Sequence, residues 1–493
     1  MDKINSIEKV MSLDDLFNPK TVLIFDAKPK ISFFIEGFIH QGFELSNLYL
    51  NSSTEDEILG IKCYKSLEEI PIKQFDLLIL SIRRELLISS LEAILSKKKI
   101  KFIHVFTAGT GESDEIGMNI EKELKHLLDA NPNTRAIGPN CMGIYSPEGK
   151  VAYYPWFPIK SGNISLISQS GDLHSRIIKF ANSKYQLLFK NGISIGNCVD
   201  VQIAEVLEYF NEDIETDLIC VYFEGFSFLH PKSGLELLSI LKIMKKPVLF
   251  MRGGITERGK KAVLSHTGSI ATKNAIWDAI YKQTPIIRVP PSLEALLNYM
   301  YLFDGYIQRF KILPGQIIYP KDKKVLVILW SGGFGILATD VLMKLGLKMP
   351  HFEGKMVNEL KKIYPLKIGS LANPLDLPWI SDTEEYYQIC KTSIEANHID
   401  LVLVETDAWS DIENDRFKKY YKNLLKLKNF TESLNKVFIL ILHEYKSELR
   451  ERIYKRFIRD DFLVFPNVQS AAESFLIFYE YGSKLSKQQN IRA

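Results

Sequence analysis

The chain has 493 residues, of which 46% are hydrophobic and 25% are charged, and this is the composition of an ordinary globular protein. That length is too great for a single hydrophobic core, so about three domains are expected. The net charge of +3 comes from 62 basic and 59 acidic residues that alternate along the chain, which argues against a nucleic-acid or membrane partner.

The N-terminal segment 1–17 contains acidic residues and has no long apolar core, so neither a signal peptide nor a transit peptide is expected. No stretch approaches the roughly 18 apolar residues of a membrane span. The cysteines are scattered, odd in number and without CxxC spacing: Cys63, Cys141, Cys198, Cys220 and Cys390. This pattern favours reduced thiols in a cytoplasmic protein and predicts no metal site.

Apolar runs that end in small or acidic residues recur along the chain and predict buried strands. They occupy 75–82, 101–109, 162–171, 217–225, 246–254, 323–333, 399–407 and 435–444. Amphipathic, helix-like stretches separate most of them. Alternation of strand and helix predicts an α/β protein with parallel sheets and right-handed crossovers.

Two changes in composition predict domain boundaries. Segment 146–162 is rich in proline and aromatic residues, and segment 310–324 places proline, glycine and a charge cluster before a new strand. The expected plan is three α/β domains at 1–148, 160–310 and 320–482.

Two predicted strands are followed by a Ser/Gly turn and a helix, which exposes backbone N–H groups at a positive helix end. The first turn contains Ser168, Ser170 and Gly171, and the second contains Ser331, Gly332 and Gly333. Such turns suit phosphate or carboxylate, although a purely structural turn is about as frequent.

His266 lies in segment 252–276, a small, polar, glycine-containing stretch expected to form a loop after the strand 246–254. Taken alone, a loop histidine is more often structural than nucleophilic. Glu224, at the end of another strand, could hold an imidazole ring by accepting a hydrogen bond, or could cap a helix or face water. Asp200 is expected to cap a helix, and Asn140 is expected to lie in a turn.

Together these segments resemble the α subunit of NDP-forming, typically ADP-forming, acyl-CoA synthetases, relatives of succinyl-CoA synthetase. The matching motifs run in order across most of the chain: LFNPKTV, LGIKCYKSLEEIP, TAG at 107–109, AIGPNCMGIYSP, ISQSG, SIGNCVDV, YFEG, RGGITERGKKAVLSHTGS, SGGFG and NPLDL. The resemblance implies a Rossmann-like CoA-binding domain followed by two flavodoxin-like ligase domains.

The resemblance also implies the chemistry. His266 would be phosphorylated during the reversible conversion of acyl-CoA, ADP and phosphate into a carboxylic acid, CoA and ATP. Glu224 would orient the imidazole, and the two Ser/Gly helix starts would hold the phosphate. The chain contains no Walker-type loop, so ATP or ADP, with Mg, is expected on an ATP-grasp β subunit.

The predicted CoA site departs from the family pattern. Where the family has a small glycine turn after its first strand, this chain has residues 26–30, and Arg83 and Arg84 replace small residues further on. CoA binding weaker than the family norm is therefore expected. The residues assigned to CoA by the resemblance are Asp26, Lys28, Lys30, Asn51, Thr107, Ala108, Gly109 and Asn140.

Further departures are Asp172, an acid beside the first phosphate turn, and Trp330 and Phe334, which add bulk around the second. These changes support an alternative function, a divergent non-catalytic or regulatory paralogue with a degraded CoA site. An NAD(P)-dependent oxidoreductase is disfavoured because the chain lacks GxGxxG.

Overall fold

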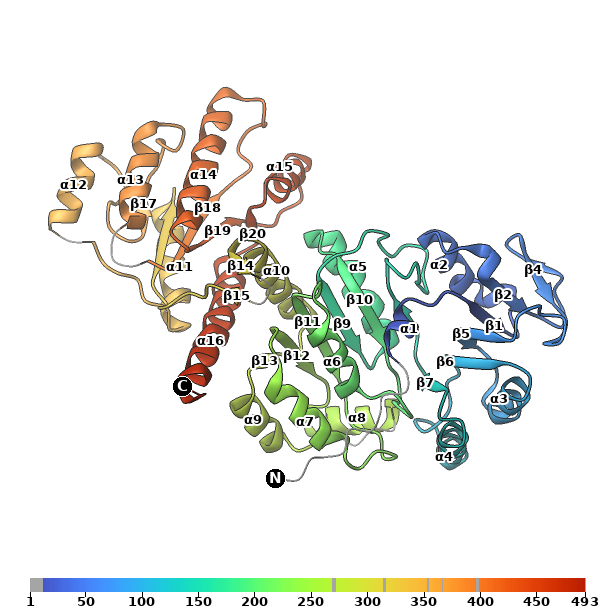
Figure 1. The fold of residues 1–493 in the computed structure, drawn as a ribbon. Helices are drawn as coiled ribbons and strands as arrows, with labels where there is room; N and C mark the ends of the chain where they lie inside the picture. Colours follow the sequence, from blue (N-terminus) through green and yellow to red (C-terminus); the bar gives the residue numbers. More distant parts are fainter. Residues whose placement is uncertain are drawn as a thin grey trace. The chain divides into compact units, whose positions relative to one another are not determined.

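The structure is a computed structural model that describes residues 12–267, 272–313, 316–352, 354–365, 367–395 and 399–492. The chain divides into two compact units, residues 1–293 and 294–493 (Figure 1). The first unit contains two large sheets and the second unit contains one. The expected division into three domains stays a prediction.

The first sheet has the strand order β3-β4-β2-β1-β5-β6-β7. Its strands are β1 Val22–Phe25, β2 Leu48–Asn51, β3 Glu57–Ile58, β4 Ile61–Tyr64, β5 Gln74–Leu80, β6 Lys99–Val105 and β7 Arg135–Ile137. Its helices are α1 Asp14–Phe17, η1 Pro29–Ile31, α2 Phe33–Gln41, η2 Leu45–Asn47, η3 Arg84–Leu86, α3 Leu87–Leu95 and α4 Glu115–Asp129. Strands β2, β1, β5, β6 and β7 are parallel, and β3 pairs antiparallel with β4.

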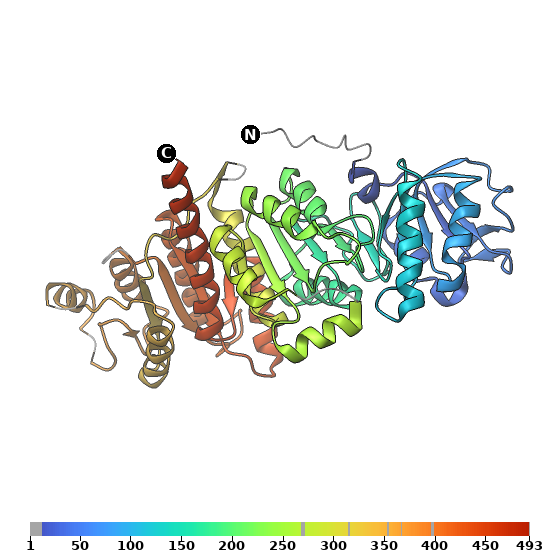
Figure 2. The same cartoon turned by 90° about the horizontal axis from the view of Figure 1, so that it is seen from below.

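The second sheet has the order β13-β12-β11-β9-β10-β8, with β8 antiparallel to its neighbour. Its strands are β8 Gly143–Tyr145, β9 Ile164–Ser168, β10 Phe189–Ser194, β11 Leu218–Phe223, β12 Val248–Arg252 and β13 Ile287–Val289. Its helices are α5 Gly171–Tyr185, α6 Ile203–Glu212, α7 Ser233–Ile243, α8 Glu257–Thr267 and α9 Asn274–Gln283. Figure 2 shows helices on both faces of its green strands, as expected for parallel strands with apolar residues on both faces.

The predicted connector, residues 146–162, is folded as part of the first unit. Tyr153 and Phe157 are fully buried there, and Gln41 of α2 donates a hydrogen bond to the Phe157 carbonyl. The Tyr153 hydroxyl is also hydrogen-bonded to His174 of α5, so the segment contacts helices that flank both sheets.

The sheet of the second unit has the order β17-β16-β18-β19-β20, all parallel. Its strands are β16 Val325–Leu329, β17 Leu375–Asp376, β18 Leu401–Thr406, β19 Val437–Leu442 and β20 Leu463–Phe465, and β14 Lys311–Leu313 forms a separate hairpin with β15 Gln316–Ile317. The helices are α10 Leu293–Phe310, α11 Gly332–Lys344, α12 Lys355–Ile363, α13 Glu384–Glu395, α14 Asp415–Ser433, α15 Glu448–Arg459 and α16 Val468–Arg492.

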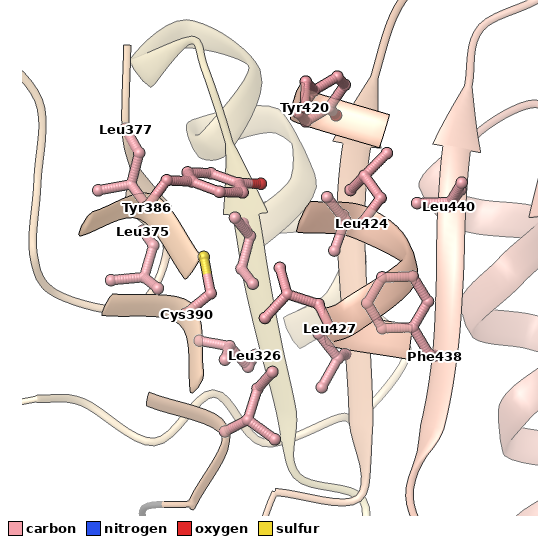
Figure 3. Packing of buried hydrophobic residues seen from close by; sticks show 14 of the residues in the cluster. Leu326, Leu375, Leu377, Tyr386, Cys390, Tyr420, Leu424, Leu427, Phe438 and Leu440 are labelled. Carbon is pink, nitrogen blue, oxygen red and sulfur yellow. The ribbon is translucent and has the colours of Figure 1, made fainter. Parts of the chain in front are cut away.

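One face of this sheet packs against α13 and α14 in a continuous apolar core (Figure 3). Leu326 of β16 and Leu440 of β19 are fully buried, as are Leu424 of α14 and Cys390 of α13. Truncating a buried leucine to alanine typically costs about 2–5 kcal/mol, so this core holds the strand ends in place.

All eight apolar runs contain strands of the parallel sheets, which confirms the α/β prediction. The five cysteines are buried and form no disulfide. In the part of the chain that the structure describes, none of the helices combines the length and the hydropathy needed to cross a membrane.

Candidate functional site

Both sheets of the first unit reverse their strand order at a central strand. Strand β1 lies between β2 and β5, and β9 lies between β10 and β11. In open α/β sheets, ligands bind outside the carboxyl ends of the strands at such a reversal. A cavity of about 560 Å³ is lined by residues that follow β1, β5, β6, β7 and β9.

The cavity brings together residues from distant parts of the sequence. Those that line it are Asp26, Lys28, Ser81, Ile82, Arg83, Leu86, Phe106, Thr107, Ala108, Asn140, Cys141, Met142, Gln169, Ser170, Gly171 and Asp172. The sequence assigned Asp26, Lys28, Thr107, Ala108, Asn140, Ser170 and Gly171 to ligand binding. Of the other assigned residues in this unit, Lys30, Asn51, Gly109, Ser168 and Glu224 do not line it.

The turn after β1 has a left-handed backbone conformation of the kind that glycine favours, although it contains no glycine. Asp26 has φ 54°, in the left-handed region that asparagine and aspartate tolerate better than most residues. Its carboxylate forms a 2.6 Å ion pair with Lys28. Behind the turn, the buried Asn51 accepts a hydrogen bond at its carbonyl from the Ala27 amide, 2.8 Å, and therefore supports the turn from the neighbouring strand.

The turn after β5 is fastened to the loop after β6. The Thr107 hydroxyl donates to the Ile82 carbonyl, 2.9 Å, and Arg84 Nη1 donates to the Gly109 carbonyl, 2.6 Å. Arg84 also donates hydrogen bonds to both carboxylate oxygens of Asp114, at 3.0 and 2.9 Å, and this interaction lowers the pKa of Asp114. Arg84 therefore has a structural role, whereas Arg83 lines the cavity.

Residues 140–142 connect the two sheets across the cavity. Asn140 has φ 59°, which fits the predicted turn, and its amide donates to the Thr107 carbonyl, 2.9 Å. The Met142 amide donates to the Ser194 hydroxyl, 3.1 Å. Burial raises the pKa of the Cys141 thiol, so this cysteine is not suited to act as a nucleophile.

Helix α5 begins at the cavity. Ser170 is its N-cap and accepts a hydrogen bond from the Leu173 amide, 3.3 Å, while the Ser168 hydroxyl donates to the Ser170 carbonyl, 2.7 Å. A Cβ atom at Gly171 would collide with Met142 Cγ, so the close packing requires glycine. The amides of the first turn and the helix dipole make this end attractive to an anion.

Asp172 places a carboxylate beside this helix start, where it would repel a bound anion. Its carboxylate forms a 2.6 Å ion pair with Arg176, one turn along α5. Both side chains are exposed, so the pair reduces the negative charge near the cavity without removing it.

The sequence reasoning missed the role of Gln169, which is 2% exposed. Its side-chain oxygen accepts hydrogen bonds from the Glu224 and Gly225 amides, and its side-chain nitrogen donates to the Gly225 carbonyl, 2.9 Å. Gln169 thus ties the helix-start turn to the end of β11. The only available signal was its position inside ISQSG, between the two serines that were singled out.

Glu224 is buried, so the alternative that it faces water is wrong. The Tyr222 side chain is hydrogen-bonded to it, and burial and this carboxylate together raise the pKa of Tyr222. A Cβ atom at Gly253, after β12, would lie 2.9 Å from the Tyr222 hydroxyl. Glu224 is therefore held in a crowded pocket at the carboxyl edge of the second sheet.

The prediction that Asp200 caps a helix is wrong. Its carboxylate accepts hydrogen bonds from Arg135, 2.9 Å, and from the Ala136 amide, 2.7 Å, while Gln202 occupies the N-cap of α6. Asp200 therefore fastens the second sheet to β7 of the first.

The predicted loop around His266 is also wrong in part, because α8 Glu257–Thr267 includes this residue. The run ERGKKAV contains mostly good helix formers, which outweigh the flanking glycines. The side chain of His266 lies outside the described part of the structure, and its approach to Glu224 stays a prediction.

The second Ser/Gly turn lies in the second unit, at the strand-order reversal on β16. Ser331 is the N-cap residue of α11, and Gly332 and Gly333 are its first residues. A Cβ atom at Gly332 would lie 3.1 Å from Asp376 Oδ2, and burial together with Glu405 raises the pKa of Asp376.

The bulky neighbours of this turn pack onto the second unit. The Trp330 ring lies 5.1 Å from that of Tyr420, and the Phe334 ring lies 4.7 Å from that of His443. Trp330 is packed against the main apolar core of the unit. Its bulk is therefore directed at least partly into the protein.

Two family models match the chain. A CoA binding domain matches residues 7–147, and a succinyl-CoA ligase like flavodoxin domain matches residues 161–303. The cavity is lined by residues from both matched regions.

Curated relatives include two α subunits from Pyrococcus furiosus. Acetate–CoA ligase [ADP-forming] II subunit alpha is 30% identical over 79% of this chain and 81% of its own length, and the I subunit alpha is 32% identical over 76% and 79%. Acetate–CoA ligase [ADP-forming] of Methanocaldococcus jannaschii is 34% identical over 65% of this chain, which spans 43% of that protein.

Among solved structures, dinucleotide forming acetyl-coenzyme A synthetase 1 of Ca. Korarchaeum cryptofilum, in complex with phosphate and ADP, has a similar fold. The match covers 97% of this chain and 99% of that one, with a TM-score of 0.76 and 22% identity.

Proposed function

Because the chain belongs to the family of α subunits of ADP-forming acyl-CoA ligases, we propose that it interconverts acyl-CoA, ADP and phosphate with a carboxylic acid, CoA and ATP. The observation that supports this most strongly is the cavity at the two strand-order reversals, where residues of both matched domains meet. A helix N-terminus at that position suits a phosphorylated ligand.

CoA is proposed to occupy this cavity. The turns after β1, β5 and β6 supply Lys28, Arg83 and the backbone of Thr107 and Ala108 on one wall. The start of α5, with Ser170 and Gly171, forms the other wall and is proposed to hold the transferred phosphate. The phosphates of CoA would lie against the wall formed by these turns, and the CoA thiol would remain free to carry the acyl group.

The proposed reaction has three steps. A phosphate oxygen attacks the thioester carbonyl of acyl-CoA, the CoA thiolate leaves, and an acyl phosphate forms. An imidazole nitrogen of His266 then attacks phosphorus, and the carboxylate leaves. The phosphoryl group next passes to the terminal phosphate of ADP, which gives ATP and frees the histidine. Each step runs in either direction.

Glu224 is proposed to position the histidine. A carboxylate that accepts a hydrogen bond from one imidazole nitrogen leaves the other nitrogen available as the nucleophile. The contacts with Gln169 and Tyr222 limit how far Glu224 can move. Preorganised N–H groups at the start of α5 would stabilise the phosphohistidine dianion without a mobile cation.

The nucleotide is proposed to bind to an ATP-grasp β subunit, which would also hold Mg²⁺. The names of the two P. furiosus relatives as α subunits support a partner chain. Those same names identify ligases, so the alternative of a non-catalytic paralogue is not favoured.

The proposal is tested by ATP formation from acyl-CoA, ADP and phosphate, with the full chain co-purified with its ATP-grasp partner. Acetyl-CoA, succinyl-CoA and phenylacetyl-CoA serve as probes, and luciferase reports ATP. We expect ATP from at least one probe and its loss in His266→Ala. His351→Ala, an exposed histidine of the second unit, is the matched control and should retain activity. No ATP from any probe would count against the proposal.

A further inference from the structure

The formal charges of the side chains that line the cavity cancel. Lys28 and Arg83 are its cationic lining residues, and Asp26 and Asp172 are its carboxylates. Lys28 is already paired with Asp26. A ligand that carries a diphosphate would therefore find no net positive charge on the side chains of the cavity. The positive end of the α5 dipole, at one wall, is the remaining attraction.

The two neighbours of Arg83 fix its backbone. The Ile82 carbonyl accepts from Thr107, and Arg84 is bound to Gly109 and Asp114. Arg83 itself has an extended backbone, φ −64° and ψ 144°, at the start of η3. Its side chain is exposed and interacts electrostatically with Glu85, but it makes no hydrogen bond or close ion pair with any residue that the structure describes. A guanidinium on a fixed backbone, with its N–H donors free of hydrogen bonds in the described structure, is suited to receive an anion.

We propose that Arg83 is the main side-chain contact for the diphosphate of CoA in this chain, and that the Asp26 carboxylate opposes it. This inference rests on the proposed function, because it takes CoA as the ligand of the cavity. The diphosphate is favoured over the 3′-phosphate because dinucleotide-type ligands place it at the turn after the first strand, where Asp26 lies. Arg83 thereby replaces the close backbone approach that a glycine turn allows.

Asp26 weakens the site in two ways. Its carboxylate repels the diphosphate directly, and it occupies Lys28 at 2.6 Å. Asparagine tolerates the same left-handed backbone, so Asp26→Asn removes the charge while it keeps the turn. The variant would release Lys28 to the ligand.

The test is calorimetric titration of the full chain with CoA and with dephospho-CoA, which retains the diphosphate and lacks the 3′-phosphate. Arg83→Gln should weaken both ligands about tenfold, which is the size of one charge-assisted hydrogen bond. Asp26→Asn should tighten both several-fold. Arg459→Gln removes the same charge from an exposed arginine of the second unit and should leave both affinities unchanged.

The outcomes separate the inference from the proposed function. If wild type binds CoA and Arg83→Gln binds it equally well, the Arg83 assignment is wrong while CoA binding stands. A loss for CoA alone, with dephospho-CoA unaffected, would move Arg83 to the 3′-phosphate and overturn the diphosphate assignment. Absence of any CoA binding to wild type would overturn both. Circular dichroism on each variant checks that the fold is retained.

Discussion

Replacing Gln169 by methionine should loosen the end of β11 and with it the support of Glu224. Methionine has nearly the length of glutamine, so the change removes the polar contacts without opening a large cavity. The amides of Glu224 and Gly225 and the carbonyl of Gly225 would lose their partner in a buried position. The effect therefore reports on the hydrogen bonds more than on packing.

The size of the effect follows from the cost of unsatisfied buried groups. Each orphaned donor or acceptor costs about 1–3 kcal/mol, and local rearrangement recovers part of it. We expect the opening free energy of this segment to fall by about 2–4 kcal/mol. Since about 1.4 kcal/mol is a factor of ten, exchange of the two amides should accelerate on the order of 100-fold.

Hydrogen exchange with mass spectrometry of a peptide that covers 217–226 measures this directly. Such a local readout is preferable because a chain of two compact units is not expected to unfold in one transition. Gln469→Met is the matched control, since that side chain is exposed and donates a hydrogen bond to Glu473 on the surface, and it should change little. Exchange in Gln169→Met within about threefold of wild type would refute the reasoning.

Two further predictions concern the first unit, residues 1–293. Burial raises the pKa of Glu121 above 4.5, so the folded state holds this proton more tightly. The resulting stabilisation is full below 4.5 and is lost as pH rises through the raised pKa. In chemical denaturation from pH 4 to 8, the unfolding transition of the first unit should show Glu121→Gln gaining stability relative to wild type as pH rises, and parallel pH profiles would contradict this. Gly171→Ala should displace Met142, because the added methyl overpacks the start of α5. We expect thermal unfolding of the first unit to show a loss of about 1–3 kcal/mol, and we expect CoA binding to weaken. Unchanged stability and affinity would show that Met142 moves away freely.

The sequence was most informative where strands end. Asp26, Thr107, Asn140 and Gly171 are far apart in the chain, yet each follows an apolar run or lies in a turn beside one. Because the carboxyl ends of parallel strands share one edge, their meeting in one cavity could be anticipated. The parallel sheets themselves followed from long apolar runs, which need both faces buried.

The details that were missed depend on side-chain direction and on burial of polar groups. Arg83 and Arg84 are adjacent and chemically alike, and only the placement of Gly109 and Asp114 separates the cavity residue from the structural one. Strand β10 escaped notice because Lys190 interrupts its apolar run. That lysine is buried and paired with Glu148 and Glu215, a tertiary arrangement that local periodicity does not reveal.

The central claim is that His266 carries phosphate, and direct detection of phosphohistidine tests it. The chain with its ATP-grasp partner would be incubated with ATP and magnesium and analysed by mass spectrometry under alkaline conditions, which preserve the phosphoramidate. Phosphate on the peptide that contains His266 in wild type, absent from His266→Ala and retained in His351→Ala, is the expected result. An unmodified His266 in wild type would contradict the account.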